Sequence, residues 1–241
     1  QLFHDLNKLG KKIDVSLANK FDSSNPINNY ASEVLMDDIF DGIYTVLDTS
    51  TEADWTDTTP SINRKALASV NALLFLNKNN INGATPADIT EHKKEIANQF
   101  WSNVLEIPGF TEKSPRLKTV AAQPVVLKAI AKLYYDIFFG KNFTLNNPDN
   151  QKALQEGLKT FDFSHSNPAW RYYLIDETER VELGLSELKS YMPAEGDGSN
   201  RDMGIYDAAT NTFRFGAKHN DIYPLIGDVI RWHCKLPTRQ K

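Results

Sequence analysis

Two short segments bring cations to the start of an expected helix, where they could bind an anion. In TPSINRKALASV, Ser61 is placed to cap a helix whose first turn contains Arg64 and Lys65. Free backbone amides at that helix start, together with two cations, suit a phosphate of DNA. The segment KSPRLK places further cations in an expected exposed loop ahead of a helix: Lys113, Arg116 and Lys118. The simpler alternative in both segments is a capped helix with solvated cations.

The segment FDFSHSNPAW holds the other candidate for chemistry, His165 close to Asp162. An imidazole and a carboxylate this near in sequence could bind a metal ion or transfer a proton. The alternative, which the sequence favours, is structural: the small polar side chains hydrogen-bond the turn before Pro168, and three aromatic residues enter the core. Those aromatic residues are Phe161, Phe163 and Trp170.

The familiar catalytic and cofactor motifs are missing from the sequence. It has no GxGxxG, GxxxxGK(S/T), GxSxG or HExxH pattern. Its single cysteine, Cys234, excludes an intramolecular disulfide and a Cys-rich zinc site. Because Cys234 follows His233 in an expected helix, it indicates a core or interface residue and not a nucleophile. We therefore expect no cofactor and no metal, and an enzymatic role is the less favoured one.

The composition is that of an ordinary globular protein: 41% of the 241 residues are hydrophobic, 24% are charged and the formal net charge is -4. No apolar stretch reaches the roughly 20 residues of a membrane helix, and no signal peptide opens the chain. We therefore expect a cytoplasmic protein with no membrane partner. No Lys or Arg occurs between Phe21 and Asn63, whereas cations gather in 8–20, 113–141 and 231–241. A basic face can exist despite the negative total.

Apolar periodicity predicts a mainly α-helical fold with a few short strands, in the α+β class. A helical core is expected to be followed by a small β-hairpin near the C-terminus, where two apolar runs flank AATN. We expect a single domain over 1–241, with a possible division into a helical core, 1–141, and an α+β extension, 142–241. The predicted helices cover 2–13, 30–39, 61–76, 86–105, 124–139, 150–159, 179–192 and 221–236, and a strand covers 43–49.

Three segments stand in the order of a known family pattern. The opening LFHDLNKLGKKIDVSLANKFDSSNP has Phe3, Asn7, Ser16-Leu17 and Asp22 at spacings like those that follow a DGQHR motif. TPSINRKALASVNAL is similar to a Ser/Arg/Lys helix start. FDFSHSNPAWR is similar to D-W-S-R-S-N-P-x-W, with His165 where the pattern has a basic residue. Together, over residues 1–171, these segments resemble DndB-type, DGQHR-domain proteins of DNA phosphorothioation systems. From Tyr172 onward the sequence departs from that pattern.

The resemblance implies a DNA-binding transcriptional regulator of a DNA phosphorothioate modification system. It places the DGQHR half upstream of Gln1, so the chain is expected to be the C-terminal portion of a longer protein. Duplex DNA is the expected partner, and the N-terminal half or other modification-system proteins are possible further partners. The candidate DNA-binding residues are Arg64, Lys65, Arg116 and Lys118, with Lys11 and Lys12 as lesser candidates.

Two other functions stay open. One is a nuclease or nucleotide hydrolase whose active site lies mostly in the upstream half, with Asp162 and His165 contributing from this chain. The other is a protein-interaction module of the same system, which would dock a partner through the acidic Asp22–Asp57 region or the C-terminal helix around Trp232. The scarcity of cysteine argues against sulfur transfer by this chain.

Overall fold

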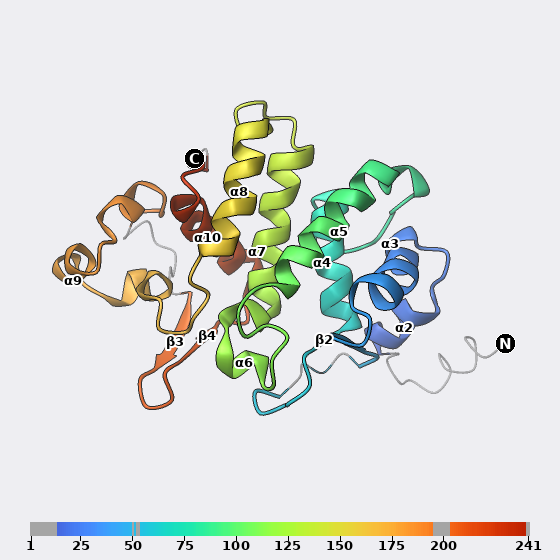
Figure 1. The fold of residues 1–241 in the computed structure, drawn as a ribbon, viewed down its shortest axis with the longest axis horizontal. Coiled ribbons are helices and arrows are strands. Elements are labelled where there is room, and N and C mark those ends of the chain that lie inside the picture. Colours follow the sequence, from blue (N-terminus) through green and yellow to red (C-terminus); the bar gives the residue numbers. More distant parts are fainter. Residues whose placement is uncertain (1–13, 50, 52–53, 195–202, 240–241) are drawn as a thin grey trace.

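The computed structural model describes residues 14–49, 51, 54–194 and 203–239. Figure 1 shows a mainly helical chain with two small two-stranded sheets, which confirms the predicted fold class. The helix predicted over 2–13 lies outside the described residues, as do Lys11 and Lys12. The single-domain organisation and its possible division near residue 141 stay predictions, although buried apolar side chains from both sides of that point join one cluster.

The first part of the described chain leads into a short parallel sheet. Its elements are α2 (Val15–Phe21), α3 (Pro26–Asn29), the π-helix η1 (Tyr30–Ile39), β1 (Thr45–Leu47) and β2 (Ser61–Asn63). Asp14 starts α2, because its carboxylate accepts hydrogen bonds from the amides of Ser16 and Leu17 at 2.8 and 3.3 Å. The strand predicted over 43–49 is present as β1 but is shorter, and it pairs in parallel with β2.

The helix after β2 begins later than the sequence predicts. Ser61 is not its cap, because strand pairing holds Ser61 in β2 opposite Thr45. Asn63 instead caps α4 (Arg64–Leu76), where its side-chain oxygen accepts a hydrogen bond from the amide of Ala66 at 2.7 Å. Arg64 and Lys65 still occupy the first turn of that helix, as predicted.

The helix predicted over 86–105 is divided into two pieces. Asp88 accepts hydrogen bonds from the amide and hydroxyl of Thr85 across the 3-10 turn η2 (Pro86–Asp88), and Thr90 separately caps α5 (Glu91–Leu105). The next elements are α6 (Pro115–Lys118), the 3-10 turn η3 (Val120–Ala122), α7 (Pro124–Tyr134) and the π-helix η4 (Tyr135–Phe139). Together α7 and η4 confirm the helix predicted over 124–139.

The last part of the chain adds helices and the predicted hairpin. Its elements are α8 (Pro148–Thr160), η5 (Pro168–Leu174), α9 (Glu177–Glu182), η6 (Ser186–Ser190), β3 (Gly204–Asp207), β4 (Thr212–Phe215) and α10 (His219–His233). β3 and β4 pair in antiparallel fashion with Gly204 opposite Phe215, which confirms the hairpin around AATN. The final helix is confirmed as α10, and it contains Pro224.

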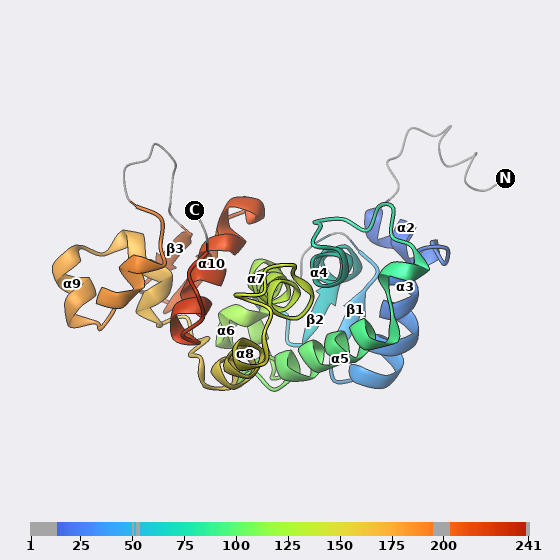
Figure 2. The same ribbon diagram turned by 90° about the horizontal axis from the view of Figure 1, so that it is seen from above.

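The core is built around α7. Seen from above in Figure 2, α7 lies between α4 and α10, and it packs against both. Its buried side chains include Val126, Ile130 and Tyr134, and burying each such side chain contributes roughly 1.5–3 kcal/mol. Tyr134 also meets the Phe100 ring edge-to-face at 5.3 Å. This packing holds the first turn of α7 in a fixed position between the start of α4 and the hairpin.

Candidate nucleic-acid interface

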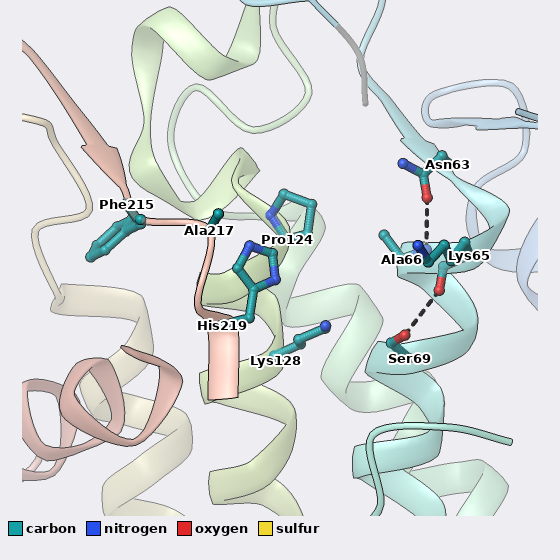
Figure 3. A pocket seen from close by; sticks show the side chains of 10 residues that line it. Asn63, Lys65, Ala66, Ser69, Pro124, Lys128, Phe215, Ala217 and His219 are labelled. Atoms are coloured by element: carbon teal, nitrogen blue, oxygen red, sulfur yellow. Dashed lines mark hydrogen bonds between the residues drawn. The ribbon is translucent and has the colours of Figure 1, made fainter. Parts of the chain in front are cut away.

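A hollow of about 460 Å³ lies where α4, α7 and the segment between β4 and α10 meet. Figure 3 shows Lys65 and Ser69 on α4 across from Pro124, Lys128 and His219. The lining residues are Asn63, Lys65, Ala66, Ser69, Pro124, Lys128, Phe215, Gly216, Ala217 and His219. None of these described residues is acidic, so the hollow has a positive lining.

The start of α4 supplies one wall of this hollow, but its amides are already occupied. The amide of Lys65 donates a hydrogen bond to the hydroxyl of buried Ser16 at 3.0 Å, and the amide of Ala66 donates to Asn63. The free amides that the sequence predicts here are therefore absent from these two positions, and the prediction of a helix-start phosphate site is wrong in that respect. The side chain of Lys65 is exposed and lines the hollow.

Arg64 points into the interior and not toward the hollow. Its Nε donates to Asp48 at 2.9 Å, one terminal nitrogen donates to the hydroxyl of Ser32 at 3.3 Å and the other contacts the sulfur of Met36 at 3.5 Å. Burial pushes the pKa of Asp48 upward, but hydrogen bonds from Lys20 and Arg64 outweigh that effect and lower it. Arg64 thus secures the junction of β1 and α4, and its phosphate contact stays a prediction.

A second hollow of about 150 Å³ adjoins the first, because both are lined by Pro124, Phe215 and His219. Its other lining residues are Trp55, Arg116, Gln123, Val125 and Arg214. The guanidinium of Arg214 lies over the Trp55 ring, 4.5 Å from the ring centroid. The two hollows together are called the basic groove below.

The two candidate cations of α6 differ in their surroundings. Arg116 is buried at the wall of the smaller hollow, whereas Lys118 is exposed. The exposed loop predicted for KSPRLK is wrong, because Pro115 starts the short helix α6 and packs the first turn inward. Lys113 precedes that helix and is exposed.

One carboxylate lies close to the smaller hollow. Asp54 accepts hydrogen bonds from the amide and hydroxyl of Thr56 at 2.9 and 2.8 Å. These bonds lower the pKa of Asp54, and the positive charges of Arg214 and Arg116 lower it further. The exposed rim beside Trp55 is therefore less positive than the larger hollow.

Gln123 and His165 fasten β4 to the helices beside it. The amide group of Gln123 donates to the Phe213 carbonyl at 2.8 Å and accepts from the Phe215 amide at 3.0 Å. Nδ1 of His165 accepts from the Phe213 amide at 2.9 Å, so Nε2 carries the proton and donates to the Arg116 carbonyl at 2.9 Å. These bonds hold β4 and the backbone of Arg116 beside the smaller hollow, which Arg116 and Arg214 both line.

Comparison with known protein families identifies the family of this chain. A family model described as DndB, DNA-sulfur modification-associated, matches residues 1–214. The chain belongs to the DndB family. The match runs through β3 to Arg214 in β4, so the predicted departure from the family at Tyr172 is wrong. No curated protein and no solved structure matched the chain. Membership of the DndB family links this protein to DNA sulfur modification.

The polar turn of this DndB protein has the structural role that the sequence favours. Asp162 accepts a hydrogen bond from the Ser164 amide at 2.8 Å, and its carbonyl accepts from Asn167 at 2.7 Å. Burial lowers the pKa of His165, and the Arg116 and Phe213 carbonyls, which would accept hydrogen bonds from the protonated ring, only partly oppose this effect. Both ring nitrogens are engaged by backbone groups, so Asp162 and His165 do not form a proton-transfer pair in this arrangement.

The described part of this DndB protein has neither a metal-binding cluster nor a membrane helix. No three His, Cys, Asp or Glu side chains among the described residues gather closely enough to hold a metal ion. No described helix combines the length and the apolar character needed to cross a bilayer. Cys234 is buried, and burial raises the pKa of its thiol to about 12.

Sequence reasoning missed several residues of the basic groove in this DndB protein. In the sequence, Lys128 is one cation among many in 113–141, and His219 belongs to no recognisable motif. Trp55 stands within the acidic region, and Arg214 and Gln123 belong to no recognisable motif. The one signal in the sequence is that Phe215 and His219 are only a few residues apart, which favours their lining the same site.

Proposed function

We propose that this DndB protein binds duplex DNA through the face that carries the basic groove and acts as a transcriptional regulator of a DNA sulfur modification system. One observation carries the proposal. Side chains from α4, α6, α7, β4 and the start of α10 converge on the groove, and those with a basic character are Lys65, Arg116, Lys128, Arg214 and His219. No described lining residue is acidic. The DNA association of the family supports the same interpretation.

The DNA contacts are assigned by exposure. Lys65 on α4 and Lys118 on α6 are both exposed. Arg214 of β4 is exposed, and Lys128 lines the larger hollow. Contacts between such side chains and phosphates supply most of the sequence-independent affinity for DNA. Arg64 takes a supporting part, because it is paired with Asp48.

A salt-series titration of fluorescently labelled duplex DNA tests the binding step. Each phosphate contact contributes about -0.9 to the slope of log affinity against log salt. We expect Lys65→Gln and Lys118→Gln each to reduce the steepness of that slope by about this amount. Lys152→Gln is the matched control, because it removes the same charge at a position outside the basic groove. Lys152 lies on α8 with its side chain 74% exposed, and it forms only a surface ion pair with Glu156.

The outcomes separate the proposal from its alternatives. Loss of slope in Lys65→Gln and Lys118→Gln, with an unchanged control, supports phosphate contact at the face that carries the basic groove. No binding by the wild-type protein at low salt refutes the proposal, as does an equal loss in Lys152→Gln. The regulatory step is tested by transcription in vitro from a promoter of the modification genes. The wild-type protein should change the transcript yield, and the Lys65→Gln, Lys118→Gln double variant should not.

A further inference from the structure

The basic groove has the size of a small-molecule site. Its larger hollow of about 460 Å³ falls within the range of about 300–1,000 Å³ that is typical of ligand pockets. A nucleotide unit can enter a hollow of this volume, whereas a base-paired duplex can only lie across its mouth. Its lining is both polar and apolar, with Lys65 on α4 across from Lys128 on α7, and with Pro124 and Phe215 on the side away from α4 (Figure 3).

Stacking groups stand beside the cations. Sites for unpaired nucleic acid combine a positive groove with aromatic side chains on which bases stack. Arg214 is exposed and covers the Trp55 ring at 4.5 Å, and a guanidinium plane can itself carry a stacked base. The ring of His165 is also close to Trp55, with the ring centroids 5.8 Å apart and the planes tilted by 46°. The Trp55–Arg214 pair therefore presents a supported surface to the smaller hollow.

An exposed apolar side chain lies next to this pair on the hairpin. Ile205 of β3 is directly opposite Arg214 of β4, so the two side chains project from the same face of the hairpin. Ile205 is 76% exposed, so its side chain is accessible to another molecule that binds this face of the hairpin. Proteins that unstack DNA insert apolar side chains of this kind between base steps.

We infer that the hairpin and the basic groove act together on DNA, with Ile205 entering the base stack and the displaced nucleotide occupying the groove. Its base stacks on the Trp55–Arg214 pair, and its flanking phosphates lie near Lys65 and Lys128. The ligand class is an unstacked nucleotide of a DNA strand. This inference rests on the proposed function, because it requires that DNA binds to this face.

Affinity for paired and mismatched duplexes tests the inference. Unpairing and unstacking a base costs least at a mismatch, so we expect the wild-type protein to bind a duplex with one mismatched base pair about tenfold more tightly than the fully paired duplex. Ile205→Ser should weaken binding to the paired duplex while leaving binding to the mismatched duplex nearly unchanged. Trp55→Ala should remove the mismatch preference, and Trp55→Phe should retain it because a stacking ring remains.

Phe143→Ala is the matched control, because Phe143 is an exposed apolar residue, 85% accessible, outside the groove lining. Thermal melting of each variant separates a folding defect from a binding defect, and Ile205→Ser changes only an exposed side chain. Equal affinity of the wild-type protein for the two duplexes overturns this inference and leaves the proposed function standing. Absence of binding to either duplex overturns both.

Discussion

The ion pair between Arg64 and Asp48 provides a test of whether Arg64 supports the fold instead of binding DNA. The two perturbations are Arg64→Met and Asp48→Ala. Arg64 has a side chain only 5% exposed, whereas that of Asp48 is 34% exposed and also accepts a hydrogen bond from Lys20 at 2.5 Å. When Arg64 is removed, Asp48 therefore keeps Lys20 as a partner. When Asp48 is removed, the buried guanidinium of Arg64 loses its carboxylate.

The expected cost of each change follows from these contacts. Arg64→Met removes one charge-assisted hydrogen bond to Asp48 and one bond to Ser32, while Lys20 remains beside Asp48. We expect a loss of about 2–3 kcal/mol in the free energy of unfolding. Asp48→Ala leaves the guanidinium buried without a carboxylate, which costs roughly 3–5 kcal/mol. Asp48→Ala should therefore be the more damaging change by about 1–2 kcal/mol.

Urea unfolding, followed by circular dichroism, measures the free energy of unfolding of each variant. The slope of that free energy against urea concentration should be unchanged if the transition stays two-state. Lys20→Ala is the control, and an exposed pair of this kind contributes less than about 1 kcal/mol. The double variant should cost less than the sum of the single variants, because Arg64 and Asp48 contact each other. The reasoning is refuted if Arg64→Met is as stable as the wild-type protein, or if Asp48→Ala costs no more than Lys20→Ala.

The pair also has a defined dependence on pH. The pKa of Asp48 is lowered in the folded state, so the folded state binds this proton less readily than the unfolded state. Its stabilisation is fully present above the unfolded pKa of about 3.9 and is lost as the pH falls through the folded value. The difference in stability between the wild-type protein and Asp48→Ala should consequently narrow below about pH 4.

Two further predictions concern other contacts. A side chain at Gly157 would place its Cβ 2.3 Å from the sulfur of Cys234, so Gly157→Ala should cost about 1–3 kcal/mol in urea unfolding. Cys234→Ala should restore part of that loss, and an undisturbed Gly157→Ala would contradict the packing of α8 on α10. Because burial lowers the pKa of His165, the unfolded state binds this proton more readily than the folded state. The free energy of unfolding should therefore decrease as the pH falls below the unfolded pKa of about 6.5. Between pH 7.5 and pH 5.5 the melting temperature should therefore drop less in His165→Gln than in the wild-type protein. His233 titrates in both proteins and so does not affect the comparison. An equal drop would contradict the contribution of buried, neutral His165 to stability.

Local sequence patterns predicted the helices and strands whose apolar periodicity and end signals lie within the element itself. The apolar run that begins at Pro124 and ends at Gly140 predicted α7 and η4, because periodicity and end signals are properties of adjacent residues. The two apolar runs around AATN predicted the hairpin for the same reason. Ser61 was mistaken for a helix cap, because β1 determines its conformation from far along the chain. The hydrogen bonds of Asp162 within its turn follow from neighbouring residues. The bonds of His165 to Phe213 and Arg116 join distant segments, so local patterns could not predict them.

The sequence by itself determined the mainly helical class, the family and the presence of many cations in a chain of negative net charge. Tertiary structure alone decided which of those cations are buried and which line the basic groove. Arg64 and Lys65 are adjacent in sequence, yet one is buried against Asp48 and the other lines the basic groove. The same holds for the stack of Arg214 on Trp55, which are far apart in sequence. The physical reason is that burial and pairing depend on packing between distant segments, whereas periodicity and capping report only on neighbours.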